Sequence, residues 1–271
     1  MQLKCPICNN PLIKSQKQYV CINKHSYDIS KEGYVNLLMS QQSNSRNHGD
    51  NAEMIKARHQ FLQKGYYQPL REKLAEIALK LLHNNEVMLD AGCGEFWYTE
   101  FIINKFIENN LNIDVIGADI SKDALQYSAK RQHNSALVVA SNNKLPLMND
   151  SCDLVLNIFA PIYKDEMLRI IKSGGHILNV SPLENHLMSL KNIIYDNPYI
   201  NAIDKWQCDG FIETENIEVK NKITVVGNDI MNLFKMTPYY HKTSQQDKNK
   251  LIPLESLEIE TEFLVTIYSR L

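Results

Sequence analysis

The sequence predicts a doubly wound α/β domain, with helices on both faces of a mostly parallel sheet, preceded by a small N-terminal module. Two observations carry this prediction. Four cysteine and histidine residues lie close together at the N-terminal end, at Cys5, Cys8, Cys21 and His25. From Val87 onward, short apolar runs alternate with helical stretches, and the crossovers of such βαβα order require parallel strands. The length of 271 residues, 44% of them apolar, suffices for one full-sized domain and one small one.

The four N-terminal residues stand at C-x₂-C-x₁₂-C-x₃-H spacing. Two short ligand pairs of this kind hold structural zinc tetrahedrally, and four protein ligands leave no open coordination position. Metal binding of roughly 10–16 kcal/mol at such sites exceeds what a module of this size gains from an apolar core. DNA-reading fingers share the spacing, but they place a helix before the second pair, whereas Gln18–Cys21 alternates like a strand. A zinc ribbon or knuckle therefore fits better, and a disulfide or buried apolar thiols are the alternative.

Charge is divided unevenly along the chain. Residues 1–50 carry six Lys and Arg against three Asp and Glu, a net charge of +3, whereas the whole chain carries −2. The zinc module is the basic end, so any nucleic acid is expected to be met there. No apolar run has the length needed to cross a bilayer, no secretory signal is recognisable, and the other cysteines are scattered. These observations predict a soluble, cytoplasmic protein.

The elements follow in order along the chain. The polar residues 41–47 predict a linker, and two helices follow, the first capped by Asp50 or Asn51. One face of the first helix comprises Met54, Ala57, Phe61 and Leu62 together with Arg58. The apolar face of the second helix comprises Leu70, Leu74, Ile77, Ala78 and Leu81. Strands are expected at Val87–Ala91, Ile113–Ala118, Ala136–Ala140, Leu154–Phe159 and His176–Val180, with helices at Phe96–Phe106, Lys122–Arg131, Asp165–Ile171 and Leu183–Tyr195.

The C-terminal part has a different pattern. Ile217–Val226 and Leu257–Tyr268 alternate like strands around a helix near Asp229–Lys235, which predicts antiparallel additions to one sheet edge. The predicted organisation is a zinc-binding module at residues 1–40, a linker with two helices at 41–84, and the α/β domain at 85–271.

The segment Asp90–Gly94 is a glycine turn between a buried strand and a helix. Glycines at 92 and 94 let the backbone turn sharply and let a ligand approach without meeting a Cβ atom. Asp119, about 25 residues on at the end of the next strand, is where such folds contact a ribose diol, although it is equally placed to cap a helix. The D-x-G-x-G loop resembles that of class I (Rossmann-like) methyltransferases, as does the later turn at Gly174 and Gly175. S-adenosylmethionine is therefore favoured over NAD as the cofactor.

Several strings together resemble the RlmA-type rRNA (guanine-N1)-methyltransferases over nearly the whole chain. These are the zinc ligands, Lys31–Leu38, Gly49-Asp50, Gly65–Leu70 and His186–Met188. The resemblance implies transfer of a methyl group from S-adenosylmethionine to N1 of a guanine in a hairpin of large-subunit (23S) rRNA. It also implies a homodimer whose zinc modules flank an RNA cleft.

By position, the residues that resemble the family's cofactor contacts are Tyr67, Gly94, Glu95 and His186. Glu95 has the charge to bind the cofactor's ammonium group. Tyr67 has packing between two helices as its alternative role, and His186 has a place on a helix surface as its alternative.

Phe96 departs from the family pattern, which has glycine at this position. Its ring could push the helix outward, narrow the cofactor site or point into the core. This departure leaves open a zinc-containing RNA-binding protein with a decayed loop. A methyltransferase acting on a small molecule is a further alternative, disfavoured by the basic zinc module.

The segment Asn157–Pro161, at the end of the fourth strand, lies where many nucleic-acid methyltransferases keep a base clamp resembling N-P-P-Y. Asn157 and Phe159 are the candidates for bonding and stacking the guanine, the alternative being that Phe159 is ordinary core. Proton removal from guanine N1 needs an acceptor, and the carboxylates near the expected mouth are Asp165, Glu166 and Glu184. No spacing selects one of them, so no general base is assigned.

Overall fold

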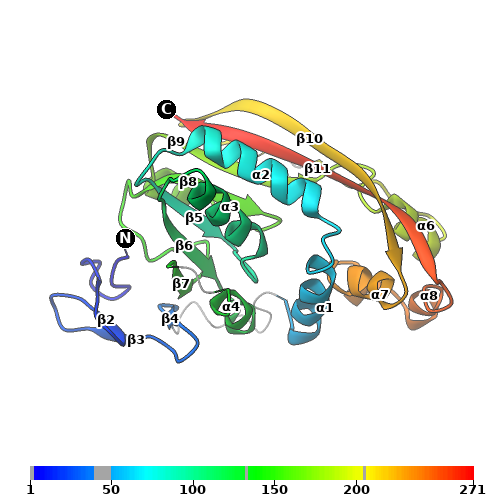
Figure 1. Cartoon of the computed structure of the whole chain (residues 1–271), viewed down its shortest axis with the longest axis horizontal. Coiled ribbons are helices and arrows are strands. Elements are labelled where there is room, and N and C mark those ends of the chain that lie inside the picture. Colours follow the sequence, from blue (N-terminus) through cyan, green and yellow to red (C-terminus); the bar gives the residue numbers. More distant parts are fainter. Residues whose placement is uncertain (1–2, 40–49, 132–133, 204–205) are drawn as a thin grey trace.

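The computed structural model describes residues 3–39, 50–131, 134–203 and 206–271, and Figure 1 shows its layered arrangement. Eight strands form one sheet in the order β10-β11-β9-β8-β5-β6-β7-β4. Their bounds are Phe211–Val226 (β10), Ser256–Arg270 (β11), Ile171–Pro182 (β9), Cys152–Ile158 (β8), Val87–Ala91 (β5), Asp114–Asp119 (β6), Ala136–Val139 (β7) and Tyr34–Asn36 (β4). The central pairs are parallel, whereas β11 is antiparallel to both β9 and β10. The predicted antiparallel addition at one sheet edge is confirmed.

Helices cover the sheet because successive strand residues bury side chains on opposite faces. Met88 of β5 belongs to one apolar cluster, together with residues of the helices Gln68–Leu81 (α2) and Trp97–Glu108 (α3). Its neighbour Leu89 belongs to the other cluster, together with residues of Lys164–Ile170 (α5). The helices are Ala52–Leu62 (α1), Gln68–Leu81 (α2), Trp97–Glu108 (α3), Lys122–Ala129 (α4), Lys164–Ile170 (α5), Met188–Ile194 (α6), Asn228–Lys235 (α7) and Gln245–Asn249 (α8), with a 3₁₀ turn at Tyr240–Lys242 (η2). Asn51 is the cap of α1, since its Oδ1 accepts a hydrogen bond from the Met54 N–H at 2.9 Å.

The predicted start of α6 at Leu183 is wrong by five residues. The strand β9 continues to Pro182, and the N–H groups of Leu183 and Leu187 then donate to the carbonyls of Glu262 and Glu260 in β11. These bonds to a neighbouring strand hold residues 183–187 out of a helix, and Leu187 takes a left-handed φ of 59°.

The N-terminal module has its own small antiparallel sheet, made of Ile13–Lys14 (β1), Gln18–Val20 (β2) and Ser26–Asp28 (β3). Its next strand, β4, joins the larger sheet instead, lying parallel to β7 at the edge (Figure 1). A second link is the hydrogen bond from the Lys4 N–H to the Pro146 carbonyl at 2.9 Å. Residues before position 40 therefore form part of both sheets. The predicted linker at 41–47 lies outside the described residues.

Candidate functional site

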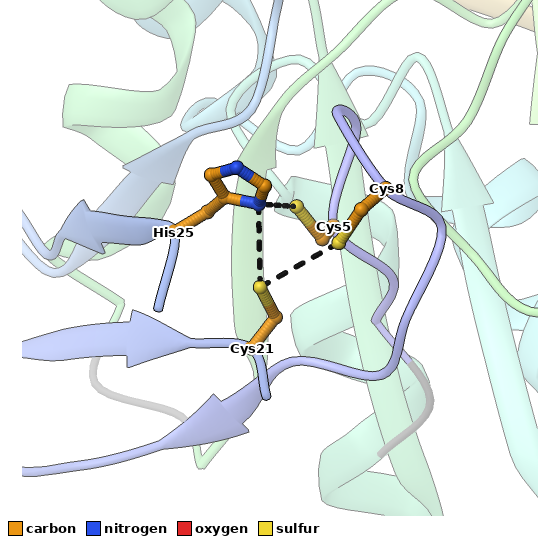
Figure 2. A group of neighbouring side chains, drawn as sticks. All are labelled: Cys5, Cys8, Cys21 and His25. Carbon is orange, nitrogen blue, oxygen red and sulfur yellow. Dashed lines mark hydrogen bonds between the residues drawn. The ribbon is translucent and has the colours of Figure 1, made fainter. Parts of the chain in front are cut away.

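The four predicted metal ligands converge in the N-terminal module (Figure 2), where their ligand atoms all lie within 4.8 Å of one another. The Nδ1 atom of His25 is 3.5 Å from the Sγ atoms of both Cys5 and Cys21, and the Cys8 and Cys21 Sγ atoms are 3.6 Å apart. Zinc–sulfur bonds of about 2.3 Å in a tetrahedron separate the ligand atoms by roughly 3.5–3.8 Å. The set fits zinc, and a sulfur–sulfur separation of 3.6 Å is far beyond the bond of about 2.05 Å in a disulfide.

Neighbouring polar groups support the sulfur ligands. The Tyr27 hydroxyl lies 3.2 Å from Cys5 Sγ, and the Asn10 side chain donates to Cys8 Sγ at 3.4 Å. Hydrogen bonds of this kind hold metal ligands in one orientation. Because four protein ligands close the coordination sphere, a zinc ion here would stabilise the fold and leave the chemistry to another site.

The glycine loop between β5 and α3 is tight at one glycine and open at the next. A Cβ atom on Gly92, whose φ is +84°, would lie 2.7 Å from the Ala160 Cβ, so the turn after β8 approaches this backbone closely. At Gly94, whose φ is +52°, a Cβ atom would meet nothing within 4 Å. Open space beside a glycine backbone is the feature that lets a nucleoside cofactor approach such a loop.

Asp119 lies at the end of β6 beside this open position. Its Oδ2 accepts a hydrogen bond from the Gly94 N–H and its Oδ1 accepts one from the Ser121 N–H, both at 2.8 Å. The cap of α4 is Ser121, whose hydroxyl accepts from the Ala124 N–H, so the helix-capping role falls to the serine. Burial raises the pKa of Asp119, and the two backbone hydrogen bonds oppose that shift. The carboxylate is therefore held against the loop, where a ribose hydroxyl would approach.

Glu95 is buried and fully engaged by the chain's own groups. One carboxylate oxygen accepts from Arg131 at 2.7 Å and from Gln63 at 3.4 Å, and the other lies 2.9 Å from His59 Nδ1. The Arg131 Nε also donates to the Glu95 carbonyl at 2.7 Å. The helix α1 and Arg131, which follows the end of α4, thus clamp the loop residue that has the charge to meet an ammonium group.

Tyr67 and His186 are brought together around Phe263. Tyr67 packs edge-on against Phe263 with ring centroids 5.0 Å apart, and the His186 ring lies 4.6 Å from Phe263 and 6.2 Å from Tyr67. The His186 Nδ1 accepts from the Glu262 N–H at 3.1 Å, which leaves its proton on Nε2. Burial lowers the pKa of His186 to about 3, with the charge of Lys191 acting in the same direction. The imidazole is therefore neutral.

Comparison with known proteins decides which of the folds with a glycine loop this is. Residues 82–247 match the family described as "Methyltransferase domain". The chain belongs to this methyltransferase family. Residues 3–46 match the zinc ribbon described as "RlmA, N-terminal", so the predicted order of a zinc module and a class I methyltransferase domain is confirmed, and S-adenosylmethionine and zinc are its cofactors.

Three similar proteins align with different shares of this chain. The 23S rRNA (guanine(748)-N(1))-methyltransferase of Streptomyces fradiae is 31% identical over 191 residues, which is 69% of this chain and 66% of that protein. YxjB of Bacillus subtilis (strain 168), to which 23S rRNA guanine-N1 methylation is provisionally assigned, is 26% identical over 97% of this chain and 95% of its own. The solved structure of the YcgJ protein from Bacillus subtilis covers 74% of this chain and 97% of its own with 12% identity and a TM-score of 0.47. Among the described residues of the methyltransferase, no helix has the length and apolar character of a membrane span.

Phe96, the departure from the family's glycine pattern, points into the core. Its φ is +67°, a left-handed conformation that glycine adopts without cost and that explains the family's preference. Its ring is buried over β6, with Cε2 at 2.8 Å from where a Cβ atom on Gly117 would lie. The loop thus keeps a glycine-like path despite the side chain, and the ring stays away from the open position at Gly94.

The turn after β8 carries the two candidates for positioning a guanine. The buried Asn157 side chain donates both amide hydrogens within the chain, to the Ala160 carbonyl and to Asn179 Oδ1, each at 2.9 Å. Phe159 is 48% exposed, has a φ of +56°, and its ring lies 5.6 Å from Phe263. The alternative that Phe159 is ordinary core is wrong, because about half of the residue is exposed.

The carboxylates near the expected mouth differ in what holds them. Glu166 is buried and accepts from the Leu145 N–H and from Arg169, which makes it part of the scaffold. Asp165 and Glu184 are exposed. The structure therefore selects no general base.

Three residues that the sequence analysis did not assign to the site surround the loop, namely Arg58, His59 and Arg131. His59 and Arg131 bind Glu95, and Arg58 forms an ion pair with Asp50. One signal was present in the sequence, because Arg58 lies on the otherwise apolar face of its helix. An arginine at such a position is buried only with a partner.

Proposed function

We propose that this protein transfers a methyl group from S-adenosylmethionine to N1 of a guanine in a hairpin of 23S rRNA. The observation that carries the proposal is the union in one chain of an RlmA-type zinc ribbon and a methyltransferase domain. The name of the Streptomyces fradiae relative supports the choice of base and atom. The cofactor supplies a methyl group already activated on a sulfonium, so the protein's task is to align the two reactants.

Each candidate residue in and around the loop has a role in this alignment. Gly94 gives the cofactor access to the backbone, Asp119 accepts from its ribose, and Glu95 accepts from its ammonium group. Tyr67 and the neutral His186 border the methionine end. Gly92 lets the loop pack against the turn after β8, which brings the cofactor and the base-positioning turn together.

The guanine is held by the turn after β8. The exposed ring of Phe159, backed by Phe263, offers a stacking face for a base, and base–aromatic stacking is worth about 1–3 kcal/mol. Asn157 holds this turn through its bond to the Ala160 carbonyl, so it positions Phe159. Because N1 lies on the Watson–Crick edge, the target guanine must be unpaired or flipped out of its helix.

Residues 1–40 are the RNA-recognition module in this proposal. Four lysines of the module, Lys14, Lys17, Lys24 and Lys31, are exposed, which supports contact with phosphates. The protein acts in the cytoplasm, where rRNA is made in bacteria such as those of its relatives, and its six cysteines form no disulfide. It acts as a homodimer whose two zinc modules flank the RNA.

The test is methylation of 23S rRNA transcripts by zinc-replete protein with labelled S-adenosylmethionine. Methylation of N1 blocks base pairing, so primer extension should stop one nucleotide before a single guanine, and nucleoside mass spectrometry should identify N1-methylguanosine. Phe159→Ala should lower the rate at least tenfold, whereas Phe159→Tyr keeps the stacking face and should retain most of the rate. A transcript that acquires no N1-methylguanosine with wild-type protein would overturn the proposed function.

A further inference from the structure

The methyl donor ends in an amino acid that carries two charges, an ammonium and a carboxylate. The proposed function gives the ammonium to Glu95 but leaves the carboxylate without a cation. Removing a carboxylate from water is costly unless a charged or hydrogen-bonding partner replaces the water. A protein that binds this zwitterion tightly therefore needs a positive group beside the loop.

Arg58 of α1 lies at this place. It forms an ion pair with Asp50, and the two side chains are only 31% and 28% exposed. The next residue along α1, His59, bonds to Glu95 at 2.9 Å, so this turn of the helix faces the glycine loop. Asp50 belongs to the segment just before the Asn51 cap and reaches the helix from outside it.

The charge of Arg58 is felt by the residues of the cofactor site. Burial raises the pKa values of Asp119, Tyr98 and Tyr67, and in all three the positive charge of Arg58 opposes the shift. Asp119 also senses the negative charge of Asp50. The ion pair therefore borders the same space as the proposed ribose and methionine contacts.

The other arginines near the loop are committed elsewhere. Arg131 bonds to both Glu95 and Glu100. Arg71 lies over the Trp97 ring, 4.1 Å from its centroid, and bonds to Glu100. Within the described residues, the ion pair of Arg58 is with Asp50, whose carboxylate has the same chemistry as that of the methyl donor.

We propose that Arg58 binds the carboxylate of the methyl donor, and that Asp50 occupies the guanidinium as an internal substitute which the bound ligand displaces. A guanidinium holds a carboxylate through two parallel hydrogen bonds, a geometry that an ammonium cannot copy. The inference rests on the proposed function only in taking S-adenosylmethionine as the ligand.

The test is calorimetric titration of the zinc-replete full chain with two ligands. S-adenosylhomocysteine carries the amino-acid end, whereas 5′-methylthioadenosine shares the nucleoside and lacks both charges. Arg58→Met should weaken S-adenosylhomocysteine about 10- to 100-fold, as expected for a lost charge-assisted pair, and leave methylthioadenosine within about twofold. Asp50→Asn removes the competitor, so S-adenosylhomocysteine should bind about 3- to 10-fold more tightly.

Lys56→Met is the matched control, because it removes an exposed positive charge from the same helix and should change neither affinity. Equal binding of S-adenosylhomocysteine to wild type and Arg58→Met would overturn the inference. So would an Arg58→Met protein that weakens both ligands alike, or an Asp50→Asn protein that loses S-adenosylhomocysteine as Arg58→Met does, since the pair would then be structural. A wild-type protein that binds neither ligand would overturn the proposed function itself.

Discussion

Substitution of Gly117 by alanine should destabilise the protein through a clash with the Phe96 ring. A Cβ atom at position 117 would lie 2.8 Å from Phe96 Cε2, 3.0 Å from Leu137 Cδ2 and 3.1 Å from Cys93 Sγ. The strand cannot shift away easily, because β6 is paired with β5 on one side and β7 on the other. Overpacking of this kind costs about 1–3 kcal/mol, and each kcal/mol lowers Tm by roughly 2–4 °C in a chain of this size.

The assay is a double-mutant cycle with Phe96→Leu, in which thermal and urea unfolding measure the stability of each variant. Leucine loses part of the buried ring and destabilises the protein by itself, but it frees the space over position 117. The double variant should therefore lose at least 1 kcal/mol less than the sum of the two single losses, within the range found for residues in contact.

Gly175→Ala is the control for this cycle. A Cβ atom at position 175 would also clash, at 2.7 Å from Ile171 Cγ2. This clash lies in β9 and does not involve Phe96. Phe96→Leu should leave the cost of Gly175→Ala unchanged. Additive losses in the Phe96 and Gly117 pair would refute the packing of Phe96 over this strand. So would a cost of Gly117→Ala below about 0.5 kcal/mol, which is usual for surface substitutions.

Two further predictions concern metal content and pH. Protein purified without added zinc should contain about one equivalent of zinc per chain, measured by atomic emission, and a wild-type zinc content near zero contradicts the metal site. The Cys21→Ser variant should lose both the zinc and the order of the β1–β3 module, which hydrogen exchange measures. Burial raises the pKa of Asp90 to about 7, although a hydrogen bond from Thr99 opposes this shift. The stabilising contribution of the Asp90 carboxyl is therefore complete below about pH 4 and is lost as pH rises through 7. In the wild type, the free energy of unfolding should fall by up to about 1.4 kcal/mol per pH unit in this range, and Asp90→Asn should flatten the fall. Urea midpoints measured from pH 5 to 8 test this, and an equally steep fall in the variant would contradict it.

Periodicity was sufficient for the central strands and insufficient where a distant segment decides the structure. The strand Val87–Ala91 is found with the predicted bounds, because a buried parallel strand is apolar on both faces and ends at a glycine turn. The strand β4 was not predicted, since its three residues acquire strand geometry only by pairing with β7, about a hundred positions later. The late start of α6 has the same cause, because β11 captures the N–H groups that a helix would have used.

The candidate site follows the same division. Spacing alone located the four candidate metal ligands, which the structure brings together, and the glycine turn after β5. Arg58 and Arg131 were not assigned, because their roles depend on which acidic group lies opposite after folding. Phe96 was recognised as a departure, but the burial of its ring depends on the glycine at position 117 of the neighbouring strand, a pairing that no single-sequence pattern contains.

The chain's own hydrogen bonds hold the glycine loop, so in the proposed binding mode the changes of contact fall on α1. The Gly94 N–H donates to Asp119, the Gly94 carbonyl accepts from Ser128 at 2.6 Å, and the Glu95 carboxylate is held by Arg131. A preformed loop lowers the ordering cost of ligand binding. In the proposed binding mode, the groups that exchange partners when the methyl donor binds are those contributed by α1, namely His59 on Glu95 and Arg58 on Asp50. Affinity for the methyl donor should therefore depend more on substitutions in this helix than on substitutions in α4, even though both helices contact the same loop.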